Sequence, residues 1–132
     1  MEESKLHIRH FILAKEFKID YNASTFNAKK IYEYISANQY PSKFDLKGML
    51  GICFLNPQKS YNIEIEILQE GDFLGRWTFR DVKVDRDYEI MNIPLNTDGH
   101  LYILKEGFID FVIKVNDEII GTQVVKAVKE EI

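Results

Sequence analysis

Cysteine, proline and glycine are all scarce in this chain. Its 132 residues include one cysteine, three prolines and seven glycines. The single cysteine, Cys53, excludes an intramolecular disulfide, and its position inside the apolar run 49–55 predicts a buried, unreactive thiol. No apolar run approaches the roughly 20 residues that span a bilayer, and residues 1–10 are polar and open acidic, unlike a secretory signal. We therefore expect a cytoplasmic protein that makes no membrane contact.

Signatures of common enzymes are also missing. The glycines of 48–51 and 71–75 lie in strand-like segments with no helix after them, so they form no phosphate-binding loop. No Gly-x-Ser-x-Gly elbow marks a serine nucleophile. Glu64 and Glu66 share a strand face at a spacing of roughly 6.5 to 7 Å, which would suit paired catalytic carboxylates. An acidic stripe opposite an isoleucine stripe is, however, typical of a solvent-facing strand surface. We predict that the protein is not an enzyme and uses no cofactor.

Positive charge is in deficit. The chain has 17 lysines and arginines against 21 aspartates and glutamates, a net charge of −4. This balance argues against a general nucleic-acid binder, whose affinity comes from basic side chains that meet phosphates. One local basic bias falls in 76–86 and is interleaved with Trp77 and Phe79, which lie on the opposite strand face from Arg76 and Arg80. That arrangement favours a buried aromatic face beneath a charged one, so we expect no nucleic-acid partner.

Metal ligands do not assemble into a convincing set. His7 and His10 are three positions apart, an odd offset that places them on opposite faces of a strand unless the strand has a bulge. Cys53 or His100 would have to complete such a site. The segment 80–89 offers three carboxylates but neither the six oxygens nor the glycine turn of a calcium loop: Asp81, Asp85 and Asp87. We predict no metal site.

Alternation of apolar and polar residues dominates the rest of the chain. In 61–68 the isoleucines face one way and the asparagine and glutamates the other, and 5–19 and 73–84 have the same period of two. Residues 70–72, "EGD", are predicted to form a turn. In the C-terminal stretch "GFIDFVIKVNDEIIG" (107–121), Asn116 and Asp117 both tolerate positive φ, so a tight hairpin turn is expected there. The predicted core includes Ile63, Ile65, Trp77, Phe79, Phe111 and Ile113.

One segment, 24–41, fits two interpretations. Ser24 or Thr25 could cap a helix whose apolar residues follow at helical spacing, and the same residues could also alternate along a strand. Isoleucine and tyrosine favour the strand, and every other element of the chain reads as a strand. We therefore predict a strand over 26–38, with the helix as the alternative.

Together these patterns predict an all-β fold, a single antiparallel β-sandwich of seven to eight strands over 1–132 with a core of about 6–127. The run 46–56 is apolar on both faces, as in a central strand covered on both sides or near a subunit contact. Residues 89–95 are expected to form an edge strand, since Pro94 lacks a backbone donor. Little in this strand prevents it from pairing with another chain.

Six segments follow one another along the chain: "FILAKEFKI", "KKIYEYI", "YPSKFDLKGMLGICF", "YNIEIEILQEGDFLGRW", "IPLN" and "EGFIDFVIKVNDEIIG". Their order resembles that of a bacterial family of small immunoglobulin-like β-sandwich proteins catalogued only as a domain of unknown function. The resemblance covers residues 11–127. It rests on Pro41 ahead of the central strand, on Ile93-Pro94-Leu95, and on Gly107 ahead of an aromatic strand. It implies an immunoglobulin-like sandwich with no assigned catalytic residues.

The composition suggests a function in binding. Seven tyrosines and nine phenylalanines exceed what one small core comfortably hides. We expect a non-enzymatic module that binds a protein partner, a second copy included. The alternative is a small-ligand or carbohydrate binder that uses exposed tyrosines. The two longest connections, 37–45 and 96–106, are expected at the same end of the body and supply the candidate binding residues Tyr40, Phe44, His100 and Tyr102. These aromatics could instead plug the end of the sandwich.

Overall fold

A computed structural model describes residues 6–22, 25–84 and 89–130, and every regular element in these ranges is a β-strand. The prediction of an all-β chain is confirmed. The described residues form eleven strands rather than seven or eight, because three short strands of three residues each add to the long ones. They are β1 (His7–Asp20), β2 (Thr25–Ile31), β3 (Ile35–Ala37), β4 (Ser42–Phe44), β5 (Lys47–Cys53), β6 (Tyr61–Gln69), β7 (Asp72–Val82), β8 (Ile90–Asn96), β9 (Leu101–Ile103), β10 (Gly107–Val115) and β11 (Glu118–Lys129).

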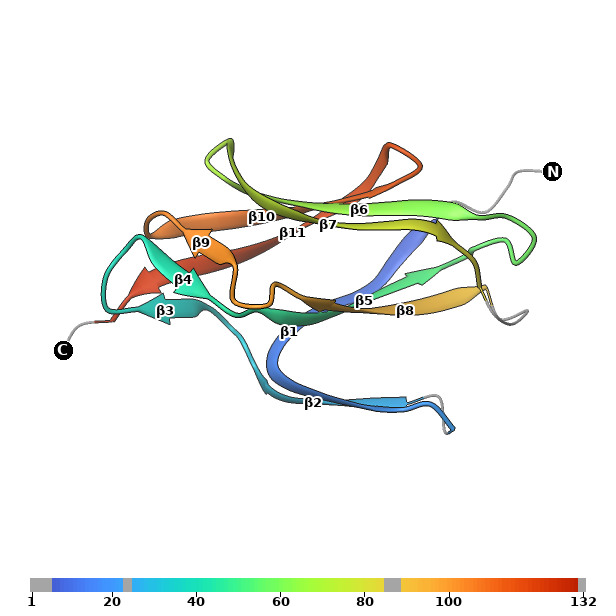
Figure 1. Ribbon diagram of the computed structural model, residues 1–132, viewed down its shortest axis with the longest axis horizontal. Coiled ribbons are helices and arrows are strands. Elements are labelled where there is room, and N and C mark those ends of the chain that lie inside the picture. The colour runs from blue at the N-terminus through green and yellow to red at the C-terminus, as the bar shows by residue number, and fades with distance from the viewer. Residues whose placement is uncertain (1–5, 23–24, 85–88, 131–132) are drawn as a thin grey trace.

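The strands form two main sheets and one small one. The five-stranded sheet has the order β3-β11-β10-β6-β7, the four-stranded sheet has the order β2-β1-β5-β8, and β4 pairs with β9. All pairings are antiparallel except that of β3 with β11, which is parallel. Figure 1 shows the five-stranded sheet lying over β1, β5 and β8, as in a sandwich. Among the described residues, no helix is long and apolar enough to cross a membrane.

The core lies between the two main sheets. The alternating isoleucines of β6 face inward and are buried, as are Ile109, Phe111, Ile113 and Val115 of β10, as their period of two predicts. From the opposite sheet, Phe11 places its ring 5.1 Å from that of Phe111. Of the six predicted core residues, four are fully buried, whereas Trp77 and Phe79 are half-buried and pack against the edge of the core. The four are Ile63, Ile65, Phe111 and Ile113.

The predicted turns are confirmed. Asn116 and Asp117 adopt φ values of 49° and 66° between β10 and β11, which is the left-handed conformation that a tight hairpin turn requires. Asn116 also accepts a hydrogen bond at 2.9 Å from the backbone N–H of Asn62, which ties the turn to β6. Glu70 and Gly71 likewise have positive φ between β6 and β7.

The ambiguous segment 24–41 contains strands and no helix in its described part. It forms β2 and β3, separated by a break at 32–34, so the strand prediction for 26–38 is confirmed in type. Lys30 has a φ of 57°, which interrupts the extended conformation near the end of β2. The interruption turns one expected strand into two, and each joins a different sheet.

The most unusual feature is the path of β1. This strand begins beside β5 and then bends, so that its second half and β2 form a hairpin that lies apart from β5 and β8 on the side away from the core (Figure 1). The hairpin covers the outer face of β5, because Met49 lies on that face and is only 1% exposed. The apolar character of both faces of 46–56 is thereby explained. One face of β5 meets the core and the other meets the chain's own hairpin.

Candidate functional site

The residues predicted for binding lie on and beside the small sheet of β4 and β9. The two connections predicted to emerge together do so, since Lys43 pairs with Tyr102 and Phe44 pairs with Leu101. Tyr40 and Phe44 stack with ring centroids 6.4 Å apart, and both pack against the core. The Tyr40 hydroxyl donates a hydrogen bond of 2.6 Å to the carbonyl oxygen of Val128. These two aromatics therefore close the end of the sandwich.

The other two predicted residues face solvent. His100 is exposed, and Tyr102 is 54% exposed. The four residues thus separate into a packed pair and an exposed pair. A separate cleft, formed by other strands, is lined by none of these four residues.

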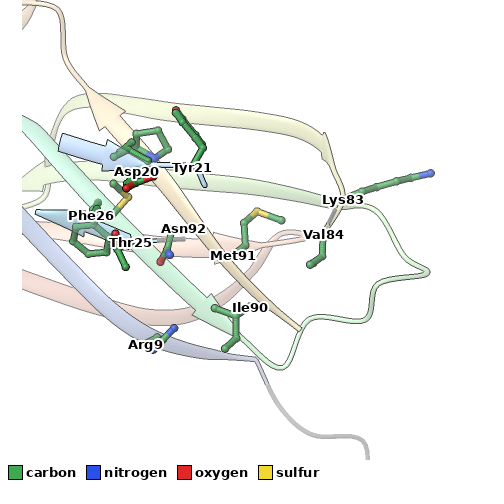
Figure 2. Close-up of a pocket in the computed structure, with 13 residues that line it drawn as sticks. Arg9, Asp20, Tyr21, Thr25, Phe26, Lys83, Val84, Ile90, Met91 and Asn92 are labelled. Carbon is green, nitrogen blue, oxygen red and sulfur yellow. The ribbon is translucent and has the colours of Figure 1, made fainter. Parts of the chain in front are cut away.

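A cleft lies between the β1–β2 hairpin and the outer face of β5 and β8, with a volume of about 420 Å³. We call it the hairpin cleft. Its residues come from the hairpin, from the sheet and from the segment after β7. They are Arg9, Ile19, Asp20, Tyr21, Thr25, Phe26, Met49, Lys83, Val84, Ile90, Met91, Asn92 and Pro94 (Figure 2). Most of these are apolar, with a few polar groups among them, as is usual for binding sites of this size.

A bulge in β1 shapes one side of the cleft. The register of β1 on β5 shifts between Ile8 and His10, so Arg9 is the extra residue and lines the cleft. The bulge also corrects the expectation for the two histidines. His7 pairs with Cys53 and His10 pairs with Gly51, two positions on one face of β5, so the histidines share a face rather than lying on opposite faces.

The shared face does not make a metal site in the described part of the chain, where no three His, Cys, Asp or Glu side chains come together closely enough to hold an ion. His7 packs its ring against Phe54 instead, with centroids 5.4 Å apart. The half-buried thiol of Cys53 faces the carbonyl oxygen of His7 at 3.7 Å. Two carboxylates of the proposed calcium segment, Asp85 and Asp87, lie outside the described residues.

His10, in the part of β1 that pairs with β5, also contacts β2. Its ring lies 5.4 Å from that of Phe26 in β2, and its Nε2 atom is buried with no hydrogen-bond partner within the described ranges. Burial lowers the pKa of His10, the neighbouring charge of Arg9 lowers it further, and the nearby side chain of Asn92 acts in the opposite direction. His10 is therefore neutral at neutral pH and packs as a largely apolar ring.

Positive charge is concentrated on β1 and β2. Of the chain's 17 basic and 21 acidic residues, five basic and only two acidic residues fall between Leu6 and Ile31. This segment therefore carries a formal net charge of about +3 while the rest of the chain carries about −7, an asymmetry that the total conceals. The five basic residues are Arg9, Lys15, Lys18, Lys29 and Lys30, and all of them are exposed.

The basic bias noted around 76–86 has a different character. Arg76 lies on β7 in the opposite sheet, forms an ion pair of 3.0 Å with Glu64, and places its guanidinium over the ring of Phe73. Lys114, on the same sheet, pairs with Glu66 at 2.7 Å. A carboxylate therefore pairs with each of these two cations. Arg86 lies outside the described residues.

An exposed aromatic residue stands at the mouth of the cleft. Tyr21 follows β1 at the tip of the hairpin and is 78% exposed. Figure 2 places Tyr21 and Asp20 on the opposite side of the cleft from Arg9. The sequence pattern did not single out Tyr21 or Arg9. The available signal was the local excess of positive charge over residues 6–31, beside a run apolar on both faces.

No protein-family model matches the chain. No curated protein sequence matches it either. Among solved structures, the chain is similar to "Pseudomonas fluorescens alkylpurine DNA glycosylase AlkC bound to DNA containing an abasic site analog", with a TM-score of 0.50 and 10% sequence identity. The similarity covers 92% of this chain and 30% of that one, so this chain spans less than a third of the length of that protein.

This likeness shows the fold, and it corrects the functional expectations. The similar structure is bound to DNA, which overturns the expectations of a protein partner or second copy and of no nucleic acid. The protein-interaction function, and the small-ligand or carbohydrate alternative, are not retained. The argument from net charge was wrong in physical terms, since a total of −4 is compatible with a locally basic surface.

Proposed function

We propose that this chain is a non-catalytic, immunoglobulin-like β-sandwich module that binds DNA through the β1–β2 hairpin and the hairpin cleft. The observation that carries the proposal is the concentration of exposed positive charge on the whole of β1 and β2, which carry five basic residues and two acidic ones. Phosphate contacts by lysine and arginine supply most of the affinity of sequence-independent DNA binding.

Two further features support the same surface. Tyr21 offers an exposed ring beside the basic residues, and aromatic rings next to basic side chains are the usual means by which proteins hold unstacked bases. The negative charge of the remaining chain would repel DNA elsewhere and so restrict contact to the hairpin. The DNA named for the similar structure is a property of that protein and is consistent with this proposal.

Fluorescence anisotropy with a labelled DNA oligonucleotide tests the proposal. The variant Lys18→Gln/Lys29→Gln removes two charges from the hairpin. In the register of β1 and β2, Lys18 lies opposite Asn27 and Lys29 lies opposite Glu16. Its matched control, Lys43→Gln/Lys129→Gln, removes two exposed charges from β4 and β11. We expect the hairpin variant to weaken binding and to reduce the dependence of log K on log salt concentration by about 1.4 to 1.8, since each phosphate contact contributes about 0.7 to 0.9.

The control separates a defined surface from a general charge effect. Both double variants have the same net charge, so a purely global effect would weaken binding equally in the two. Equal losses, or no binding of the unmodified protein at low salt, would contradict the proposal.

A further inference from the structure

We propose that the hairpin cleft binds one unpaired nucleotide, an inference that rests on the proposed DNA-binding function. The hairpin surface then selects single-stranded over duplex DNA. Phosphate contacts alone would bind both forms. A cleft that accepts a base, in contrast, can be filled only where a base is free to leave its stack.

The size and lining of the cleft fit a nucleobase. Its volume of about 420 Å³ lies in the range of small-molecule sites, which run from about 300 to 1,000 Å³. Phe26, Met49 and Pro94 supply apolar walls from three different strands. Asn92 also lines the cleft, and its side chain lies near Phe26 and Thr25 in Figure 2. The flat faces of a base suit these walls, and its polar edge suits the amide, which can both donate and accept hydrogen bonds.

The charges at the mouth of the cleft determine the orientation of the bound nucleotide. Arg9 lies on one side and Asp20 on the other (Figure 2). A phosphate is attracted to the guanidinium and repelled by the carboxylate, so the phosphate belongs on the Arg9 side. The Lys83 side chain extends away from the cleft in Figure 2, where it is placed to meet the backbone beyond the bound nucleotide.

Tyr21 extends the site by one base. Its ring lines the cleft and is 78% exposed, so it offers a stacking surface for the base next to the one that enters. Stacking of this kind depends on unpaired bases and tolerates any sequence. The cleft and Tyr21 together would therefore favour a flexible single strand.

The test compares the affinities of a labelled 12-nucleotide single strand and of its duplex, both at pH 8. We expect the single strand to bind at least about tenfold more tightly. Tyr21→Ala should weaken single-strand binding by about fivefold to a hundredfold, the range for loss of one stacked base, and should leave duplex binding unchanged. Tyr34→Ala, at a tyrosine that is 54% exposed and lies outside the cleft, is the matched control and should change neither.

A second pair of variants tests entry into the cleft. Asn92→Asp places a negative charge inside it with almost no change in shape, and like charges brought together across an interface are strongly unfavourable. Asn96→Asp adds the same charge on the same strand, where the Asn96 side chain accepts a hydrogen bond of 2.8 Å from the backbone N–H of Asp98 that aspartate can also accept. We expect Asn92→Asp to reduce single-strand affinity by about tenfold and Asn96→Asp to leave it nearly unchanged. Thermal melts check that both variants are folded.

The outcomes separate this inference from the proposed function. Equal affinity for single strand and duplex, weakened alike by Lys18→Gln/Lys29→Gln, would overturn the cleft inference and leave DNA binding intact. Absence of binding to either form would overturn both. Deoxyadenosine monophosphate that competes as well as the 12-nucleotide strand, on a molar basis, would also overturn the inference, because the site would then serve free nucleotides.

Discussion

The imidazole of His10 lies directly over Gly51, so closely that a Cβ atom at position 51 would come within 2.5 Å of the ring. Glycine is therefore required on β5 by a side chain of β1. The relationship matters for function because the same imidazole lies 5.4 Å from the ring of Phe26, which lines the hairpin cleft.

Gly51→Ala should destabilise the protein by about 1 to 3 kcal/mol, the usual cost of forcing extra volume into a packed site. Gly75→Ala is the matched control on another strand, where the nearest atom to a new Cβ, on Leu101, is 3.8 Å away. Chemical denaturation of both variants checks the difference. A loss at position 75 as large as that at position 51 would show that the His10 contact is not the cause.

Stability should fall below neutral pH through His10. Because burial and Arg9 lower the pKa of His10 in the folded protein below 6.5, the unfolded chain takes up a proton at a pH where the folded protein does not. The free energy of unfolding therefore decreases as the pH drops through about 6.5 and stops decreasing, for this group, once the folded state also protonates.

Denaturation at pH 8 and at pH 5 measures this effect. The decrease should be smaller in His10→Gln, which cannot titrate, than in the unmodified protein. His100→Gln, at an exposed histidine, should retain the full decrease. Identical pH dependence in the unmodified protein and in His10→Gln would exclude His10 as the source.

Tyr40 is expected to stabilise the fold. Tyr40→Phe should cost about 0.5 to 1.5 kcal/mol, because it removes the hydrogen bond to the Val128 carbonyl. Tyr40→Ala should cost more than about 2 kcal/mol, because the ring also packs on Phe44 and the core. Tyr102→Ala, at an exposed ring, should change stability little. Thermal melts of the three variants check this order, and a neutral Tyr40→Ala would return Tyr40 to the candidate binding residues.

The sequence predicted those parts of the fold in which local pattern and tertiary environment agree. Alternation in β6 and β10 follows burial residue by residue, and the turn at Asn116 and Asp117 follows from the conformations these two residues tolerate. The break after Lys30 was not predictable, since nothing in a lysine signals positive φ.

The candidate site was missed for a related reason. The bulge at Arg9 and the bend of β1 arise from contacts between distant segments, such as His10 with Gly51, and no short window of sequence contains both partners. Net charge was misleading because it averages a basic hairpin with an acidic remainder. Counting charge by predicted element, rather than by chain, would have shown the difference.

The most direct test of the central claim is a backbone amide NMR titration of the 15.5 kDa protein with a 12-nucleotide single-stranded DNA at low salt. We expect chemical-shift changes concentrated on β1, β2 and β8, with the largest near Arg9, Tyr21 and Asn92. The outer face of β10 and β11 should remain unchanged. Shifts concentrated on β10 and β11, or no shifts at saturating DNA, would contradict the claim.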